Sequence, residues 1–177
     1  MCAAPGVDPA AAGGDAPNWG ERSVRELVDH VLAVHHAGER ACLGRLRGLA
    51  EEAVRRSAEA SPVLRKVAAT LAQLSEELLG HMEREEQVLF PLLLEREAEG
   101  RTGAASWDRE TELSRLHREH DHAGDLLEDL RILTQDYRVS GPEQEFLRPL
   151  YVALGELDAD LQLHIELENR WLFSRAV

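Results

Sequence analysis

The chain has 177 residues, of which 44% are hydrophobic, and this is enough for one compact domain with a buried core. It carries 20 Lys and Arg against 33 Asp and Glu, a formal net charge of -13. Because nucleic-acid binding depends on clustered positive charge, this balance argues against DNA or RNA as a partner.

The N-terminal segment differs in composition from the rest of the chain. Residues 1–20 are mainly Ala, Gly, Pro and Asp, contain no Lys or Arg, and show no periodicity. We expect them to form a disordered leader rather than a secretory signal, followed by one domain over residues 21–177. No run of eighteen apolar residues is present, so we expect no membrane span and a cytoplasmic location. The only cysteines are Cys2 and Cys42, too few for a disulfide framework or a cysteine metal site, so nitrogen and oxygen would have to hold any metal.

Two segments in the first half of the domain have helical composition. The first is predicted to begin at Ser23, which forms an S-x-x-E capping box with Glu26, and to run to about Arg56. The second is predicted to begin at Ser61-Pro62 and to fade near Gly100. Pro91 lacks a backbone donor and should kink this helix or end it early.

Two further helices are predicted after the Gly-rich loop at 100–103. One should run from about Asp108 to Arg138, and the other from Gly141-Pro142 almost to Val177, with Pro149 as a late start or a bend. No strand alternation is present. Four helices of about thirty residues joined by short loops predict an all-α, up-down-up-down four-helix bundle.

Apolar stripes with residues alternately four and three apart run along the last three helices, and polar residues interrupt each stripe. The second helix has Val67, Leu71, Leu74, Leu78, His81, Glu85, Val88 and Leu92. The third has Leu113, Leu116, His120, Ala123, Leu127, Leu130, Thr134 and Tyr137. The fourth has Leu147, Leu150, Leu154, Leu157, Leu161, His164, Glu168 and Trp171.

Histidine and glutamate four residues apart share one helix face on these stripes, as His81 with Glu85 and His164 with Glu168. A buried carboxylate needs a compensating positive charge, and the stripes contain no Lys or Arg, so a metal cation is indicated. In the first helix periodicity allows two readings of the stripe and does not choose between them. One is Leu32, His36, Glu39, Leu43 and Leu46, and the other is Leu32, His35, Glu39, Cys42 and Leu46.

The inward ligands number about four His and two Glu, too many for one tetrahedral zinc and suited to two metals bridged by carboxylates. We therefore expect two iron ions in a non-haem centre with a bridging oxide or hydroxide. The alternative is a metal-free bundle in which each histidine is a core residue hydrogen-bonded to a facing carboxylate.

Four strings resemble hemerythrin-like proteins, and most closely the bacterial iron–sulfur cluster repair di-iron proteins: HVLAVHH at 30–36, HMEREEQVLFPL at 81–92, EHDHAG at 119–124 and DLQLHIELENRWLF at 160–173. The resemblance covers roughly residues 19–177. It implies a di-iron centre with ligands at His36, His81, Glu85, His120, His164 and Glu168, the two Glu acting as bridges, and it selects His36 over His35.

The resemblance also implies a function. Such proteins are linked to the repair of iron–sulfur clusters damaged by nitric oxide or oxidants, through iron donation or processing of nitric oxide or peroxide. Damaged iron–sulfur proteins and small diatomic or peroxide ligands are then the expected partners, with the chain a monomer or homodimer. The alternative is a module that binds or senses oxygen or nitric oxide and signals through a partner.

The chain departs from the pattern of these families at several positions. It has only Cys2 where repair proteins often carry a module with adjacent cysteines, and Arg170 interrupts their usual ENNxLFP ending. Gly124 stands where oxygen-carrying hemerythrins place a second histidine on the third helix, so we expect an open metal position near Gly124. We interpret His30, His35, His117 and His122 as surface residues or as residues that orient a ligand, and Glu86 as solvated.

Overall fold

The computed structural model describes residues 18–57, 61–98 and 109–175, and within these ranges the secondary structure is helical, with no strand. The predicted all-α fold is confirmed. Most of the expected leader (1–17) and the Gly-rich loop at 100–103 lie outside the described residues. None of the described helices is both long and apolar enough to cross a membrane.

The first helix of the bundle is one continuous run of three elements, preceded by the short turn η2 (Trp19–Glu21). These are α1 (Val24–His30), the π-helical η3 (Val31–His36) and α2 (Ala37–Arg56). The predicted capping box is present, since Ser23 Oγ accepts from the Glu26 amide at 3.1 Å and Glu26 Oε2 accepts from the Ser23 amide at 2.9 Å.

The second helix is also continuous and consists of α3 (Pro62–Arg84), the π-helical η4 (Glu85–Leu89) and α4 (Phe90–Ala98). Of the two effects expected of Pro91, a kink or an early end, the early end is wrong, because the helix continues to Ala98. The π turn η4 ends two residues before the proline, and its changed hydrogen-bond pattern accommodates a residue that has no N–H to donate.

The third helix, α5 (Arg109–Thr134), ends four residues before the predicted Arg138. Gln135, Asp136 and Tyr137 have φ values of 53°, 56° and 59°, a left-handed conformation that cannot continue the helix. The fourth helix begins with the 3-10 turn η5 (Pro142–Leu147). It continues as α6 (Arg148–Leu167), the π-helical η6 (Glu168–Leu172) and η7 (Phe173–Arg175), so the predicted late start at Pro149 is confirmed.

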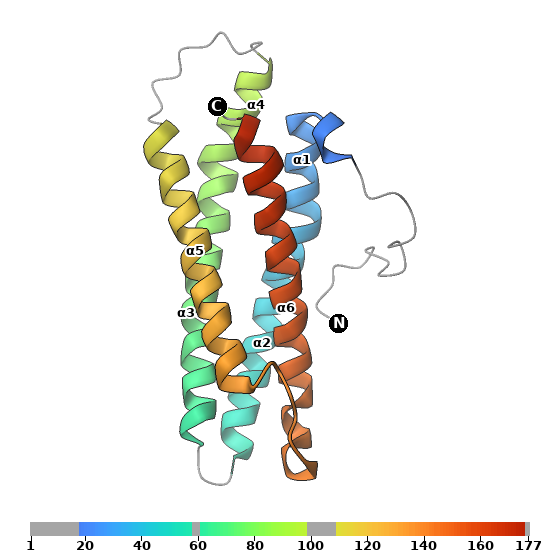
Figure 1. Ribbon diagram of the computed structural model, residues 1–177, viewed down its shortest axis with the longest axis vertical. Helices are drawn as coiled ribbons and strands as arrows, with labels where there is room; N and C mark the ends of the chain where they lie inside the picture. The colour runs from blue at the N-terminus through green and yellow to red at the C-terminus, as the bar shows by residue number, and fades with distance from the viewer. Residues whose placement is uncertain (1–17, 58–60, 99–108, 176–177) are drawn as a thin grey trace.

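The helices alternate in direction, as predicted (Figure 1). Helix α2 packs against α3 and α6, and α5 packs against the same two helices from the other side. The buried apolar residues form two clusters, one around Leu46, Leu74, Leu130 and Leu154 and the other around Leu27, Phe90 and Leu172. Along each helix the buried His and Glu residues lie at the boundary of these two clusters, so a polar layer crosses the bundle.

The π turns explain where the predicted stripes fail. A π turn inserts one extra residue, so the helix face that points inward moves by one position after it. Leu89 and Leu93 are therefore buried in place of Val88 and Leu92, and Leu172 is buried in place of Trp171.

Candidate metal centre

Six side chains predicted as ligands meet in the polar layer, and all six are buried. The four helices of the bundle each contribute at least one, and three of them do so at a π turn. His36 ends η3, Glu85 begins η4 and Glu168 begins η6. The extra residue in each π turn widens the backbone where these side chains enter the core.

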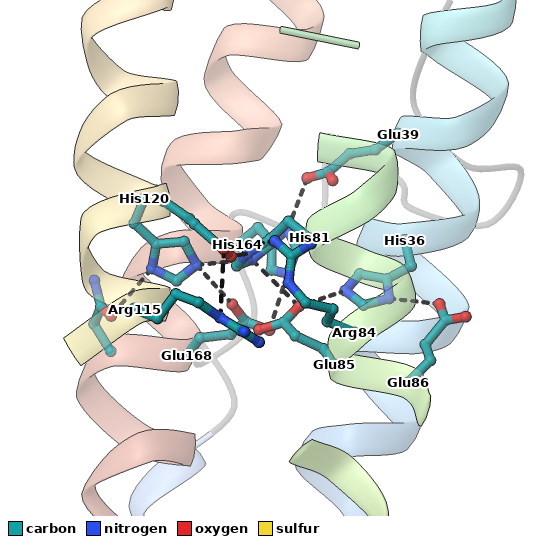
Figure 2. Close-up of polar contacts among 12 residues, drawn as sticks. His36, Glu39, His81, Arg84, Glu85, Glu86, Arg115, His120, His164 and Glu168 are labelled. Atoms are coloured by element: carbon teal, nitrogen blue, oxygen red, sulfur yellow. Dashed lines mark hydrogen bonds and ion pairs between the residues drawn. The ribbon is translucent and has the colours of Figure 1, made fainter. Parts of the chain in front are cut away.

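The two carboxylates lie in the middle of the four imidazoles (Figure 2). Glu85 Oε2 lies 3.3 Å from His36 Nε2 and 3.4 Å from His81 Nε2. Glu168 Oε2 lies 3.3 Å from His120 Nε2, and its Oε1 lies 3.1 Å from His164 Nε2.

These contacts define two groups of possible metal ligands that share both carboxylates. One group is His36, Glu85, His164 and Glu168, and the other is His81, Glu85, His120 and Glu168. Within each group, one ligand atom from every residue lies within 4.8 Å of the others. Two cation positions bridged by two carboxylates are the arrangement that such sharing permits.

Several inner atoms of this layer have no hydrogen-bond partner. Both oxygens of Glu85 and of Glu168, together with Nε2 of His36 and of His164, are buried and make no hydrogen bond despite the short distances between them. The Nε2 atoms of His81 and His120 face each other at 3.0 Å. A buried polar atom without a partner costs free energy, so this donor set fits a cation better than it fits a solvent-free core.

The outer ring nitrogen of each imidazole is held by an acceptor. Nδ1 of His36 lies 2.8 Å from Glu86, and Nδ1 of His81 lies 2.9 Å from Glu119. The corresponding contacts of the other two rings are His120 Nδ1 to Asn169 Oδ1 at 3.2 Å and His164 Nδ1 to Glu39 Oε1 at 2.8 Å. With the proton on Nδ1, each ring turns a lone pair on Nε2 toward the carboxylates, which is the tautomer that a metal ligand requires.

Sequence reasoning missed the role of these four acceptors. Glu86 is 30% exposed and so retains contact with solvent, but it also accepts from His36 and from Arg40 Nη1 at 2.7 Å. Glu39 belongs to the apolar stripe of the first helix in both of its readings. That position was the one sequence signal that could have identified Glu39 as a buried acceptor. Glu119 and Asn169 lie beside predicted ligands in sequence, but their hydrogen bonds reach another helix.

The electrostatics of the layer follow from burial and from the two carboxylates. Burial raises the pKa of Glu85 well above its usual range, and the nearby Glu168 carboxylate raises it further. Burial also acts to raise the pKa of Glu168, but His164 and His120 outweigh it and hold that pKa well below its usual range.

The pKa values of His36 and His164 also shift in opposite directions. Burial and the charge of His164 lower the pKa of His36 to about 4. Burial opposes the charged form of His164 too, but Glu168 and Glu39 raise its pKa well above the usual value. Without a cation, burial thus favours the protonated form of Glu85, and the two carboxylates favour the protonated form of His164. Because metal ligands must be deprotonated, metal binding should release protons.

A cavity of about 350 Å³ leads to this layer between α3, α5 and α6, and its walls include His81, His120 and His164. Gly124 is not part of these walls. It is exposed, and a Cβ placed on it would meet no atom within 4 Å. The two residues before it, His122 and Ala123, line the cavity, so the opening lies next to Gly124 on α5.

The remaining histidines lie outside the six-ligand set. His117 and His122 are exposed on α5. His30 is partly buried beside Trp19, with their ring centroids 4.5 Å apart. His35 is buried and stacks on His164, with ring centroids 5.0 Å apart. The structure thus turns both His35 and His36 inward, and of these two it is His36 that reaches Glu85.

Comparison with known proteins agrees with this geometry. The family model of the hemerythrin HHE cation-binding domain matches residues 27–176. The iron-sulfur cluster repair protein YtfE of Enterobacter sp. (strain 638) is 32% identical over 160 residues, which cover 90% of this chain and 69% of that protein. YtfE proteins of Cronobacter sakazakii and Escherichia coli O157:H7 are 34% and 32% identical over the same shares of the two chains.

Proposed function

Because the chain belongs to the family of hemerythrin HHE cation-binding domains, we propose that it is a di-iron protein that acts in the repair of iron–sulfur clusters. The relatives reported above are named for that repair. The proposal extends to clusters damaged by nitric oxide or oxidants. Repair requires that the protein and its damaged clients share a compartment, and we propose the cytoplasm.

The observation that carries the proposal is the sharing of Glu85 and Glu168 by two groups of histidines. A single metal would use one histidine pair and leave the other pair unpaired in the core. The proposed ligands are His36, His81, Glu85, His120, His164 and Glu168, with the two carboxylates as bridges.

Iron is the metal that we propose because of the donor types. Each group offers two imidazole nitrogens and carboxylate oxygens, and two histidines with a carboxylate are typical of non-haem ferrous sites that keep open coordination positions. When bound, the iron pair would supply redox chemistry and a source of exchangeable iron.

The protein's own residues would orient the centre and control access to it. Glu39, Glu86, Glu119 and Asn169 hold the four imidazoles in the ligating tautomer. The cavity of about 350 Å³ between α3, α5 and α6 is large enough to hold a diatomic molecule or peroxide beside His81 and His120. Such ligands are the proposed small-molecule partners of the site.

The proposal is tested first by metal content and then by repair. The full chain is loaded with ferrous iron without oxygen, and about two irons per chain are expected after removal of unbound metal. Glu85→Ala and Glu168→Ala should lower this content, whereas Glu83→Ala, an exposed position on the same helix, should not.

Repair is then measured on an enzyme whose [4Fe–4S] cluster has been damaged with nitric oxide. The iron-loaded protein should restore its activity faster than an equal amount of free ferrous iron, and Glu168→Ala should not. Full iron content with no restoration would contradict the repair function and favour ligand binding or sensing. Unchanged iron content in both Glu variants would contradict the metal centre itself.

A further inference from the structure

A third cluster of possible ligands lies beside the six proposed ligands and shares none of them. It consists of His35 from η3, Glu39 from α2 and Asp160 from α6. One nitrogen or oxygen atom of each lies within 4.8 Å of the others. His35 and Glu39 are buried, whereas the Asp160 side chain is 35% exposed, so the cluster connects the core with solvent.

Two buried atoms of this cluster have no hydrogen-bond partner, namely His35 Nδ1 and Glu39 Oε2. His35 Nδ1 lies 3.2 Å from Asp160 Oδ1, but the two atoms lack the alignment of a hydrogen bond. Orphaned buried atoms of this kind call for a partner, and a cation can satisfy all three residues together.

We propose that His35, Glu39 and Asp160 form a third cation site for a divalent first-row metal, which in the cell is ferrous iron. One imidazole nitrogen and two carboxylate oxygens suit such ions, and the two negative charges compensate the charge of the metal. The partial exposure of Asp160 leaves the site open to water, so its metal exchanges more readily than metals in the closed layer.

Glu39 couples this site to the metal centre. Its Oε1 accepts from His164 Nδ1 at 2.8 Å, while its Oε2 is the unpaired atom. A cation on Oε2 withdraws negative charge from the carboxylate that orients His164 and makes its ring more basic. Occupation of the third site therefore weakens the hold of His164 on its own metal, and binding at the two places is negatively coupled.

This coupling deepens the proposed function and rests on it, because it offers a way to release iron to a damaged cluster. An arriving cation at the third site loosens the metal held by His164. The binding of a third cation does not itself depend on the repair function.

The test uses the full chain loaded with two ferrous irons per chain and titrated with Mn²⁺ in the absence of oxygen. Electron paramagnetic resonance measures the free Mn²⁺, and metal analysis of the same samples measures the iron retained. The wild type should bind about one Mn²⁺ per chain more tightly than Asp160→Asn does, by about tenfold or more. Asp129→Asn makes the same chemical change at an exposed position on α5 and should bind Mn²⁺ as the wild type does.

Iron release to an external chelator tests the coupling. Added Mn²⁺ should speed release from the wild type and from Asp129→Asn, but not from Asp160→Asn. Equal Mn²⁺ binding by the wild type and Asp160→Asn overturns the third site, and equal release rates with and without Mn²⁺ overturn the coupling. Failure of the wild type to retain iron before any Mn²⁺ is added is a failure of the proposed function, and the difference in Mn²⁺ binding between the variants still decides the third site.

Discussion

Replacement of Glu85 by Leu should have opposite effects on metal binding and on the stability of the metal-free protein. The side chain is fully buried, and neither of its oxygens has a hydrogen-bond partner. Burial and the neighbouring Glu168 raise the pKa of Glu85 well above the usual range. Keeping this group out of water therefore lowers the stability of the metal-free protein. Leucine has a similar volume and removes that cost.

The size of the effect follows from the contacts that are absent. An unpaired buried polar group costs about 1–3 kcal/mol, and replacement of buried ionic groups by apolar residues of similar volume is often neutral or stabilising by about 1–4 kcal/mol. We therefore expect Glu85→Leu to raise the free energy of unfolding of the metal-free protein by about 1–3 kcal/mol. With ferrous iron at a hundred times its dissociation constant, the wild type gains about 2.7 kcal/mol for each site, and the variant loses that gain.

Urea unfolding followed by circular dichroism measures both effects, once with a strong chelator and once with ferrous iron in the absence of oxygen. Glu83→Leu is the matched control, because Glu83 is exposed on the same helix and its replacement should change the free energy of unfolding by no more than about 0.5 kcal/mol.

Two results would refute the reasoning. A metal-free Glu85→Leu protein that is less stable than the wild type by more than about 1 kcal/mol would show that Glu85 makes a stabilising contact in the core. A variant that still retains both irons would show that Glu85 is not a ligand.

Three other predictions concern Glu119, which accepts from a proposed ligand, the buried carboxylate of Asp158, and the removal of iron. Glu119→Gln should weaken iron binding by about 10- to 100-fold in a chelator competition, because Glu119 orients His81 through the 2.9 Å contact, and helix content should stay unchanged. Asp158→Ala should lower the free energy of unfolding, measured in urea, by about 2–3 kcal/mol. The Asp158 carboxylate accepts from Arg131 at 2.7 and 2.6 Å and from the Tyr137 hydroxyl at 2.8 Å. A loss smaller than that of an exposed-site variant would contradict this prediction. Burial acts to raise the pKa of Asp158, but these hydrogen bonds outweigh it and hold the pKa below its usual value of 3.8. The contribution of Asp158 to the free energy of unfolding is therefore complete above pH 3.8 and is lost as the pH falls through the folded-state pKa. Unfolding curves at neutral and acid pH will show this loss. Removal of iron by a strong chelator should lower the thermal midpoint of the wild type, and an unchanged midpoint in calorimetry would favour the metal-free bundle.

The sequence was sufficient for much of the fold and most of the site because these features depend on local spacing. The start of the first helix follows from Ser23 and Glu26, which satisfy each other's backbone within one turn. His81 with Glu85 and His164 with Glu168 lie four residues apart in phase with Leu stripes, and a helix of 3.6 residues per turn must place each pair on one face.

Only the tertiary structure decided features that depend on a change of helical register or on contacts between helices. The sequence alone could not choose between His35 and His36, because the π turn η3 inserts a residue and turns both rings into the core. It could not reveal that Glu39 holds His164, since 125 residues separate them in the chain. Periodicity within one helix shows which face is buried, but the partner that meets a side chain on that face is set by the packing of the other three helices.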